Sequence, residues 1–334
     1  MKQMFREQHT RRQLLRFSRV PALILSGEAT TQNAAYHNHP MTHCAWAEHV
    51  LPLTVTTEHQ EQFQRYGHVM LPQLIDGRTV KLLNDRLEAV LQDCFDLGQA
   101  PDKMPKGRNA WSCGKRTLQI VNIRKADAAF RRVIMSPELG KFIASLAGWP
   151  GTRVASDQVW AKPPTGGPLV FHRDSAYFDF VPSDVITLWL ALDDMTPDVG
   201  PLEYVHGSHL WGEGRIGSAN QFFDRDRFGL MLQAAKSEGL GLEDLTISMV
   251  KCNAGGAGVH NGRTWHGSGP NTSRSKPRRG LGIHFVPSNV TFKDAPLGNM
   301  WRKFRDEDGV VDEKAFQQEF PVTFQFSSAA TDHI

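Results

Sequence analysis

The residues best suited to chemistry in this sequence are His172 and Asp174, two positions apart, and the later His266. Residues two apart in a strand point to the same side, so an imidazole and a carboxylate at this spacing can both turn toward one ion. A second histidine completes a set of two imidazoles and one carboxylate. That set suits non-haem Fe(II) and leaves coordination positions open for a co-substrate and O2.

A His-x-Asp pair alone is a weak signal, because a surface histidine beside a turn aspartate gives the same pattern. Three further stretches strengthen it: Lys162-Pro163-Pro164 before the pair, the run GPLEYVHGSH after it, and the run HNGRTWHGSGPNTS that leads into Arg278-Arg279. An arginine one strand beyond the last histidine is what a dicarboxylate co-substrate needs. Its planar guanidinium can bind the remote carboxylate with two hydrogen bonds while the 2-oxo acid end chelates the metal.

With these stretches in this order, the chain resembles the phytanoyl-CoA dioxygenase family of Fe(II)/2-oxoglutarate oxygenases over about residues 60–290. The runs FHRDSAYFDFVPSDVITLWLALDD, RRGLGIHF and YGHVMLP also match. The resemblance implies His172, Asp174 and His266 as iron ligands, with 2-oxoglutarate and O2 as co-substrates. It implies Arg278 as the residue that binds the co-substrate, with Arg279 as the alternative. The co-substrate pocket of the family further implies three neighbours, Lys162, Trp189 and Ser268.

The alternation of the last matching strand favours Arg278 over Arg279. Adjacent residues of a strand point to opposite faces, so only one of the two arginines can face a ligand. Gly280, Gly282 and His284 share the side of Arg278 and leave room there. The apolar residues of the same strand share the side of Arg279 and suit packing beneath helices: Leu281, Ile283 and Phe285.

The resemblance implies an enzyme that hydroxylates a small organic substrate, such as an acyl-CoA, an amino-acid derivative or a secondary metabolite, and releases succinate and CO2. A carboxylate ligand at Asp174 favours hydroxylation over halogenation, because it leaves no vacant position for chloride. Two alternatives stay open. A zinc hydrolase can use two histidines, a carboxylate and water, and a cupin-like module can bind metal without turnover.

Not every matching residue need be catalytic, and the sequence also departs from the family pattern. Trp189 and Trp265 are equally consistent with core packing, and four more histidines are expected to be structural or supporting: His206, His209, His260 and His284. Gly256 stands where the family often has an acidic residue. Residues 95–125 and 211–245 match nothing that identifies a substrate.

Composition is that of an ordinary globular chain. Of 334 residues, 40% are hydrophobic and 22% charged, and no apolar run approaches the ~18 residues of a membrane span. The net charge of +3 and the lack of a basic stripe with interleaved aromatics argue against nucleic acid as a partner. The four cysteines lack CxxC spacing, which is typical of a reducing compartment and favours the cytoplasm. The sequence does not indicate an oligomeric state.

Residues 1–50 differ from the remainder because arginines are frequent and acidic residues are rare. Such a segment is typical of a flexible extension or of a mitochondrial transit peptide. We expect it to be dispensable for catalysis, and we expect residues 51–334 to form a single dioxygenase domain.

The elements that must position the site change character along the chain. Helical patterns predict helices over residues 58–66, from Asp76 to near Gly98, and over 126–146 with a break at Ser136-Pro137. A strand is expected at 67–72, and a helical insert at 221–238. Six short strands are expected in the second half: residues 153–161, 169–172, 185–192, 202–205, 245–251 and 278–286. Together they predict a mainly β protein with helical support (α+β), a double-stranded β-helix of the jelly-roll, cupin-like type.

Overall fold

Two antiparallel sheets carry the structure, a computed structural model that describes residues 50–105, 116–212, 226–298 and 300–327. Residues 47–334 form one unit. The expectations for residues 1–50 fall almost wholly outside the described residues, and both they and the single-domain assignment stay predictions. None of the helices in these four ranges is long and apolar enough to cross a membrane.

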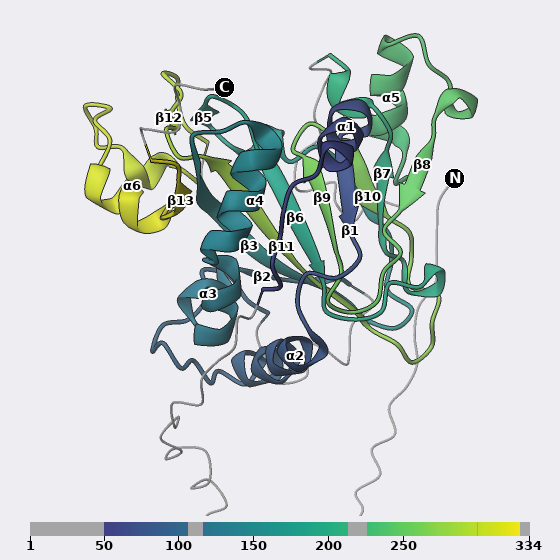
Figure 1. The fold of residues 1–334 in the computed structure, drawn as a ribbon, viewed down its shortest axis with the longest axis horizontal. Helices are drawn as coiled ribbons and strands as arrows, with labels where there is room; N and C mark the ends of the chain where they lie inside the picture. Colours follow the sequence, from purple (N-terminus) through teal and green to yellow (C-terminus); the bar gives the residue numbers. More distant parts are fainter. Residues whose placement is uncertain (1–49, 106–115, 213–225, 299, 328–334) are drawn as a thin grey trace, which may run out of the picture. The chain divides into compact units, whose positions relative to one another are not determined.

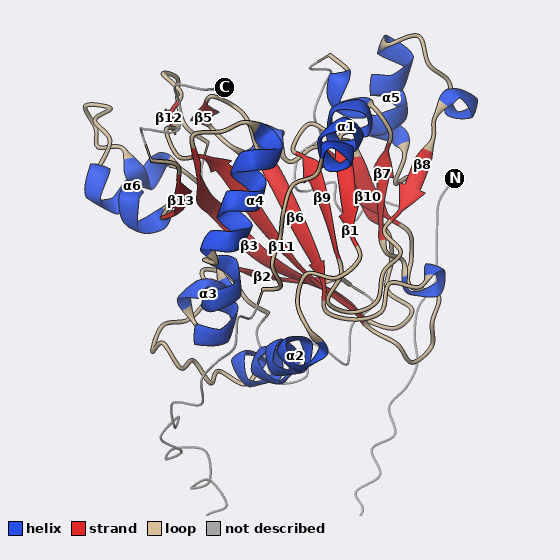
Figure 2. Cartoon of the chain, viewed as in Figure 1, coloured by secondary structure: helices blue, strands red, loops and turns tan. Residues whose placement is uncertain are grey.

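The larger sheet has seven strands and forms the floor on which the site is built (Figure 2). In spatial order they are β1 (His68–Leu71), β9 (Ala257–Asn261), β6 (Ile186–Ala191), β11 (Arg278–Pro287), β3 (Gly151–Lys162) and β13 (Val322–Gln325), with β2 (Leu118–Val121) also paired to β3. The smaller sheet has the order β4 (Leu169–His172), β10 (His266–Ser268), β7 (Leu202–Val205) and β8 (Ile247–Met249). A two-stranded ribbon, β5 (Phe180–Val181) and β12 (Thr291–Phe292), completes the strands.

Helices cover the outer face of the larger sheet (Figure 1). They are α1 (Thr57–Tyr66), α2 (Gly77–Leu91), α3 (Ala128–Ile134) and α4 (Pro137–Ala147). Their apolar side chains pack on Leu281, Ile283 and Phe285 of β11, all of which are fully buried. The predicted apolar row of this strand therefore faces the helices, and the opposite side of β11 faces the space between the sheets.

Helices α2 and α4 each begin after a residue whose side chain caps them. The Asp76 carboxylate accepts the Thr79 backbone N–H at 2.7 Å, and the Ser136 hydroxyl accepts that of Leu139 at 3.4 Å. The expected end of α2 near Gly98 is wrong, because the helix stops at Leu91. Asp93 takes a left-handed conformation (φ 62°), which closes the helix before the next turn can form.

Most of the predicted strands are present, with ends shifted by a residue or two. Two strands escaped prediction although the site depends on them, β9 and β10. Both are short and rich in small or polar residues, so their local patterns are weak. They form because each lies between two partner strands that bond its backbone on both sides. Of the insert expected at 221–238, helix α5 (Gly229–Ser237) is observed, and residues 221–225 lie outside the described part.

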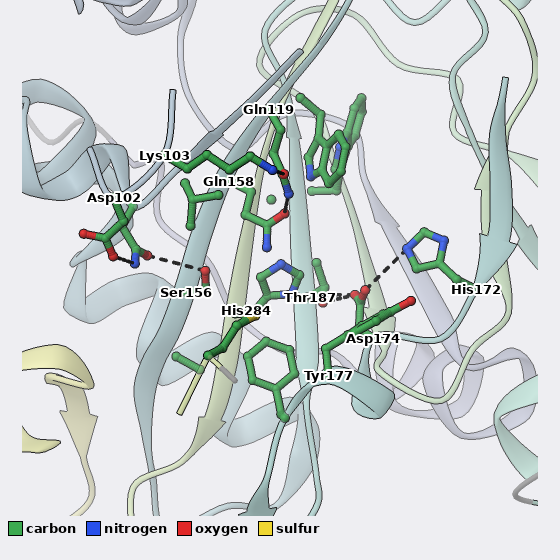
Figure 3. Close-up of a pocket in the computed structure, with 18 of the residues that line it drawn as sticks. Asp102, Lys103, Gln119, Ser156, Gln158, His172, Asp174, Tyr177, Thr187 and His284 are labelled. Atoms are coloured by element: carbon green, nitrogen blue, oxygen red, sulfur yellow. Dashed lines mark hydrogen bonds and ion pairs between the residues drawn. The ribbon is translucent and has the colours of Figure 1, made fainter. Parts of the chain in front are cut away.

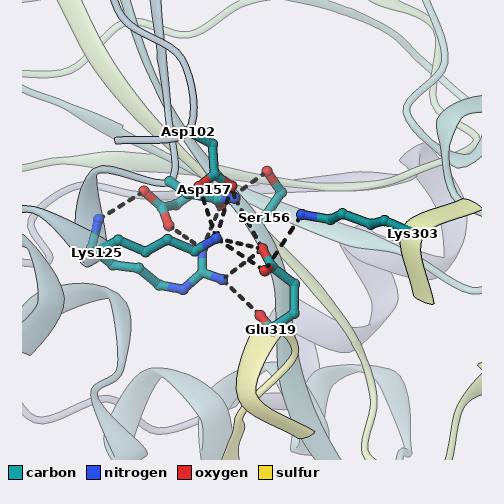
Figure 4. A network of polar contacts seen from close by, with 8 residues as sticks. Asp102, Lys125, Ser156, Asp157, Lys303 and Glu319 are labelled. Carbon is teal, nitrogen blue, oxygen red and sulfur yellow. Dashed lines mark hydrogen bonds and ion pairs between the residues drawn. The ribbon is translucent and has the colours of Figure 1, made fainter. Parts of the chain in front are cut away.

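The C-terminal segment packs an aromatic cluster against the end of the sheets, which sequence patterns did not reveal. Its apolar centre combines Trp301, Phe304, Phe316 and Phe320 with Phe180 of β5. Helix α6 (Glu313–Glu319) carries Glu319 from this segment to a polar network on β3 and the chain near residue 124 (Figure 4).

In that network Arg124 and Asp157 form a buried ion pair, with Nη1 2.6 Å from Oδ2. Burial raises the pKa of Asp157, an effect opposed by the charge of Arg124 and its hydrogen bond. The same guanidinium donates to the Glu319 backbone carbonyl at 2.7 Å. The pair therefore connects the C-terminal segment to the centre of the larger sheet.

We expect Asp157→Asn to lower the free energy of unfolding by about 3 kcal/mol, because it leaves the buried Arg124 cation without its nearest counter-charge. The Glu319 carboxylate lies 3.8 Å from Nη2 of Arg124 and still pairs with it in the variant. The expected loss of stability is therefore at the lower end of the range for buried ion pairs. Asp85→Asn is the matched control, since Asp85 pairs with Lys81 on the exposed face of α2. That change is expected to cost less than about 1 kcal/mol. Urea denaturation of both variants measures the difference, and equal losses would contradict the assignment.

Candidate active site

The two histidines of the predicted triad face each other across neighbouring strands. His172 on β4 is the register partner of His266 on β10, and their ring centroids are 4.2 Å apart. Asp174 follows the end of β4 and begins a short 3-10 helix, which turns its carboxylate back toward both rings. Its Oδ1 lies 3.7 Å from Nε2 of His172 and 3.5 Å from Nε2 of His266. One donor atom from each residue lies within 4.8 Å of the others, so the three can hold one metal ion.

Hydrogen bonds fix which nitrogen of each imidazole faces the ion. Nδ1 of His172 lies 2.9 Å from the carbonyl of Val170, and Nδ1 of His266 lies 2.9 Å from that of Thr264. A carbonyl only accepts, so Nδ1 donates in both rings and Nε2 keeps a lone pair for a metal. Burial lowers the pKa of each histidine to about 4. Both imidazoles are therefore neutral at neutral pH, the form that binds metal.

The second carboxylate oxygen of Asp174, Oδ2, forms hydrogen bonds with side chains of the larger sheet. Thr187 donates to Oδ2 at 2.6 Å, and Nε2 of His260 lies 3.1 Å from the same atom. Thr187 in turn lies 2.9 Å from Nδ1 of His284, and Nδ1 of His260 lies 3.2 Å from the Tyr204 hydroxyl. Burial opposes ionisation of Asp174, but the electrostatic interaction with His266 and the hydrogen bond with His260 outweigh it and hold the pKa of Asp174 well below its usual value. Oδ1 is thereby directed at the histidines.

This support comes from one straight row across the sheet. His284 of β11 is the register partner of Ser156 on β3 and of Thr187 on β6, and Thr187 is that of His260 on β9. The predicted supporting role of His260 and His284 agrees with this geometry. His206 instead contacts Ser248, and His209, the fourth of these histidines, lies against the backbone of α1.

The predicted co-substrate residues gather at the other end of the space between the sheets. Arg278 of β11 is the register partner of Lys162 on β3, and both side chains are fully buried. Ser268 of β10 accepts from both, at 2.8 Å from Lys162 Nζ and 3.2 Å from Arg278 Nη2. Two buried basic side chains thus converge on one hydroxyl, and Lys162 also donates to the carbonyl of Gly269.

Two of the hydrogen-bond donors of Arg278 are available to a ligand. Its Nε and Nη1 are buried and have no hydrogen-bond partner among the described residues. Burial lowers its pKa to about 10, so the guanidinium stays charged at neutral pH. A buried, charged group with unpaired N–H groups is costly unless a ligand pairs with it. The donor set therefore fits the remote carboxylate of 2-oxoglutarate, as the triad fits Fe(II).

Arg279 points away from this space, as the alternation predicted. Its Nη2 and Nε lie 2.6 and 2.9 Å from the Asp193 carboxylate, and Glu88 of α2 is 3.9 Å from its Nη1. These carboxylates already pair its charge. Gly256, which stands where the family often has an acidic residue, has no room for one, because an added Cβ would lie 2.7 Å from the carbonyl of Pro72.

Trp189 and two glycines shape the middle of the pocket. The Arg278 guanidinium carbon lies 5.5 Å from the centre of the Trp189 ring. A Cβ at Gly280 would come within 2.1 Å of that ring, whereas one at Gly282 would have no neighbour closer than 3.8 Å. Gly280 therefore makes the place in which Trp189 lies. Trp265, the other tryptophan of the matching runs, is buried in the core beside α5.

A cavity of about 730 Å³ joins the triad, Trp189 and Arg278 (Figure 3), a size that takes a small organic ligand. It is also lined by residues to which the sequence analysis gave no role: Lys103, Gln119, Gln158, Trp301, Lys303 and Phe304. These residues carried no signal because no motif or spacing relates them. The fold alone brings them together.

A sequence model of the phytanoyl-CoA dioxygenase family matches residues 63–280, well over half of the chain. The chain belongs to the phytanoyl-CoA dioxygenase family. Membership confirms the predicted family and, at the level of the family, the predicted class of enzyme, an oxygenase that depends on Fe(II) and 2-oxoglutarate.

Two curated relatives are similar over part of their length. A probable alpha-ketoglutarate-dependent hypophosphite dioxygenase of Stutzerimonas stutzeri is 26% identical over 134 residues, 38% of this chain and 42% of that protein. Phytanoyl-CoA dioxygenase domain-containing protein 1 of Mus musculus is 30% identical over 90 residues, 27% of this chain and 31% of that protein. The matches thus span less than half of either relative.

Solved structures support the fold. The carbocyclase SnoK of nogalamycin biosynthesis superposes with a TM-score of 0.60 at 20% identity, over 80% of this chain and 96% of its own. The epimerase SnoN of the same biosynthesis gives 0.56 at 18% identity, over 80% and 97%. The predicted jelly-roll fold is confirmed.

The two glycines of β11 give a matched test of the pocket shape. We expect Gly280→Ala to displace Trp189, because the new methyl group would overlap the ring, and overpacking of this kind costs about 1–3 kcal/mol. Gly282→Ala should cost less than Gly280→Ala, since its methyl group meets nothing closer than van der Waals distance. Near-ultraviolet circular dichroism and thermal unfolding report the two effects. A Trp189 signal unchanged by Gly280→Ala would contradict this packing.

Proposed function

We propose that this protein is an Fe(II)/2-oxoglutarate-dependent dioxygenase that hydroxylates a small organic molecule and releases succinate and CO2. One observation carries the proposal: the triad of His172, Asp174 and His266 and the Arg278 guanidinium open into the same cavity. Two of the guanidinium donors have no partner among the described residues. A metal site alone fits many chemistries. A metal site that shares its cavity with a buried cation fits a co-substrate with a chelating end and a remote carboxylate.

Each residue has a defined task in this proposal. His172 and His266 bind Fe(II) through Nε2, and Asp174 binds it through Oδ1. Arg278 and Lys162 bind the remote carboxylate of 2-oxoglutarate, and Ser268 keeps the two cations oriented toward it. Trp189 forms the wall beside the co-substrate, and the glycines of β11 leave space for it.

With O2 and 2-oxoglutarate, the iron supplies the oxidising chemistry that inserts hydroxyl into a substrate C–H bond. The protein's part is to orient the reactants and to keep the site dry. Thr187 and His260 hold Oδ2 of Asp174, which keeps its orientation fixed while other ligands come and go. Phe178 and Trp301 line the cavity with apolar rings, which helps to exclude water.

Two alternatives use the same triad. A zinc hydrolase would need the metal and a water molecule, but it would leave the unpaired donors of Arg278 without a purpose. A metal-binding module without turnover would not need a cavity of this size beside the ion. Both are less favoured for these reasons.

An anaerobic titration tests the proposal. Addition of Fe(II) and then 2-oxoglutarate should produce the visible metal-to-ligand charge-transfer band of the chelated complex. His172→Ala, Asp174→Ala and His266→Ala should each lose the band and all iron-dependent turnover while staying folded, because each removes a ligand. His209→Ala is the control, since this histidine lies away from the site. Full activity of any triad variant would exclude that residue as a ligand, and activity with Zn(II) alone would favour the hydrolase.

The two adjacent arginines should respond differently. Arg278→Ala is expected to weaken 2-oxoglutarate binding by at least about 30-fold, because loss of a desolvated charge pair costs about 2–5 kcal/mol. Arg279→Ala should act mainly on stability, through loss of its pair with Asp193. Succinate formation at varied 2-oxoglutarate separates the two. Weakened co-substrate binding in Arg279→Ala alone would contradict the assignment.

Lys162 gives a pH-linked prediction. Burial, with the charge of Arg278 adding to it, lowers the pKa of Lys162 to about 5, so its amine is neutral at pH 7 without a ligand. A bound carboxylate favours the ammonium form and raises that pKa. Binding of 2-oxoglutarate at pH 7 should therefore take up close to one proton. Calorimetry in buffers of different ionisation enthalpy measures this number, and Lys162→Met should reduce it to near zero. Equal uptake in wild type and variant would contradict this role.

A further inference from the structure

The outer half of the cavity contains a chain of hydrogen bonds that the proposed chemistry does not use. Lys103, Gln119 and Gln158, which we name the amide strip, lie one after another along the cavity (Figure 3). Gln158 of β3 is the register partner of Gly282 on β11, beside the place proposed for the co-substrate. Lys103 is exposed and Gln158 is half-buried, so the strip runs inward from the surface to β3.

The hydrogen bonds of the amide strip all run in one direction. Nζ of Lys103 donates to Oε1 of Gln119 at 3.0 Å, and Nε2 of Gln119 donates to Oε1 of Gln158 at 2.7 Å. Since both amide oxygens are engaged, the free end of the strip is the NH2 group of Gln158. That group has no hydrogen-bond partner among the described residues and lines the cavity. The strip thus presents donors, and a ligand beside it must supply an acceptor.

The charges around the mouth favour an acceptor that is an anion. The carboxylates there are already paired: Asp102 with Lys125 at 2.8 Å, and Glu319 with Lys125 at 2.8 Å and with Lys303 at 3.9 Å (Figure 4). Within the described ranges, Lys103 has no carboxylate within ion-pair distance. Its charge is therefore available to a ligand.

An aromatic wall lines the same cavity as the amide strip. We use this name for Phe178, Trp301 and Phe304, of which Phe178 and Trp301 stack with centroids 5.8 Å apart. Trp301 is anchored by its indole N–H, which donates to the carbonyl of Tyr177 at 2.9 Å. Trp301 and Phe304 come from the C-terminal segment, beyond the residues that match the family. The wall offers a flat apolar surface to the body of a ligand.

From these two surfaces we propose that the substrate is a small organic monocarboxylate with an apolar, ring-sized body. Its carboxylate pairs with Lys103, whose ammonium group the amide strip holds in place, and its body lies against Trp301 and Phe178. A single unpaired cation matches the single charge of a carboxylate better than the double charge of a phosphate monoester. This inference rests on the proposed function, because it takes the remainder of the cavity to hold Fe(II) and 2-oxoglutarate.

Binding calorimetry on the protein loaded anaerobically with Fe(II) and 2-oxoglutarate tests the proposed monocarboxylate substrate. The probes are 3-phenylpropionate, its neutral amide 3-phenylpropanamide, and 2-phenylethyl phosphate. Saturating 2-oxoglutarate keeps the probes away from Arg278. We expect the carboxylate to bind about tenfold or more tightly than the amide, the size of a hydrogen bond to a charged group, and more tightly than the phosphate.

Matched variants locate the effect. Lys103→Met, which removes the charge and keeps the length, should abolish the preference for carboxylate over amide. Gln158→Leu should reduce it. Lys81→Met, on the exposed face of α2, changes the net charge equally and should leave the preference intact.

Three results would overturn the inference: loaded protein that binds none of the probes, a preference that survives Lys103→Met, or tighter binding of the phosphate than of the carboxylate. Failure of the proposed function looks different, because the protein would then not form the charge-transfer complex during loading, before any probe is added.

Discussion

The site depends on one pairing, that of β4 with β10, which sets His172 directly opposite His266. Neither histidine can turn to the ion unless the smaller sheet keeps this register, since a slip of one residue would point one ring to the other face. The larger sheet supplies the complement. Its row of His284, Thr187 and His260 holds one oxygen of Asp174 and thereby directs the other. The proposed metal site thus lies between two sheets, each of which fixes part of it.

Two buried arginines differ in how far their charges and donors are paired by other protein groups. Arg124 is buried with Asp157 and Glu319 around it, so its charge stabilises the attachment of the C-terminal segment. Arg278 is equally buried but keeps two donors without a protein partner within the described residues. A fold selected for stability alone would not bury a cation in this way. The contrast between these arginines is why Arg278 is assigned to a ligand.

The sequence predicts those parts of the site that lie in recognisable local motifs and keep the same arrangement in the fold. The triad, Lys162 and Arg278 lie in motifs whose order is informative, and alternation along β11 predicts that Arg278 and Arg279 lie on opposite faces of the strand. Sequence reasoning missed β9 and β10, because short strands with glycine and histidine form only when their neighbours pair with them. It also missed Gln158 and Trp301. These two meet in one cavity only because the C-terminal segment folds back on β3, and no spacing in the chain records that contact.

The most direct test of the account measures products with the wild-type protein. Incubation with 2-oxoglutarate, Fe(II) and O2 should yield succinate and CO2 in equal amounts, and omission of Fe(II) or O2 should stop both. Substitution of Zn(II) should not restore them. Succinate that appears without Fe(II) or O2, or none from protein shown to bind both Fe(II) and 2-oxoglutarate in the presence of a bound substrate, would contradict it.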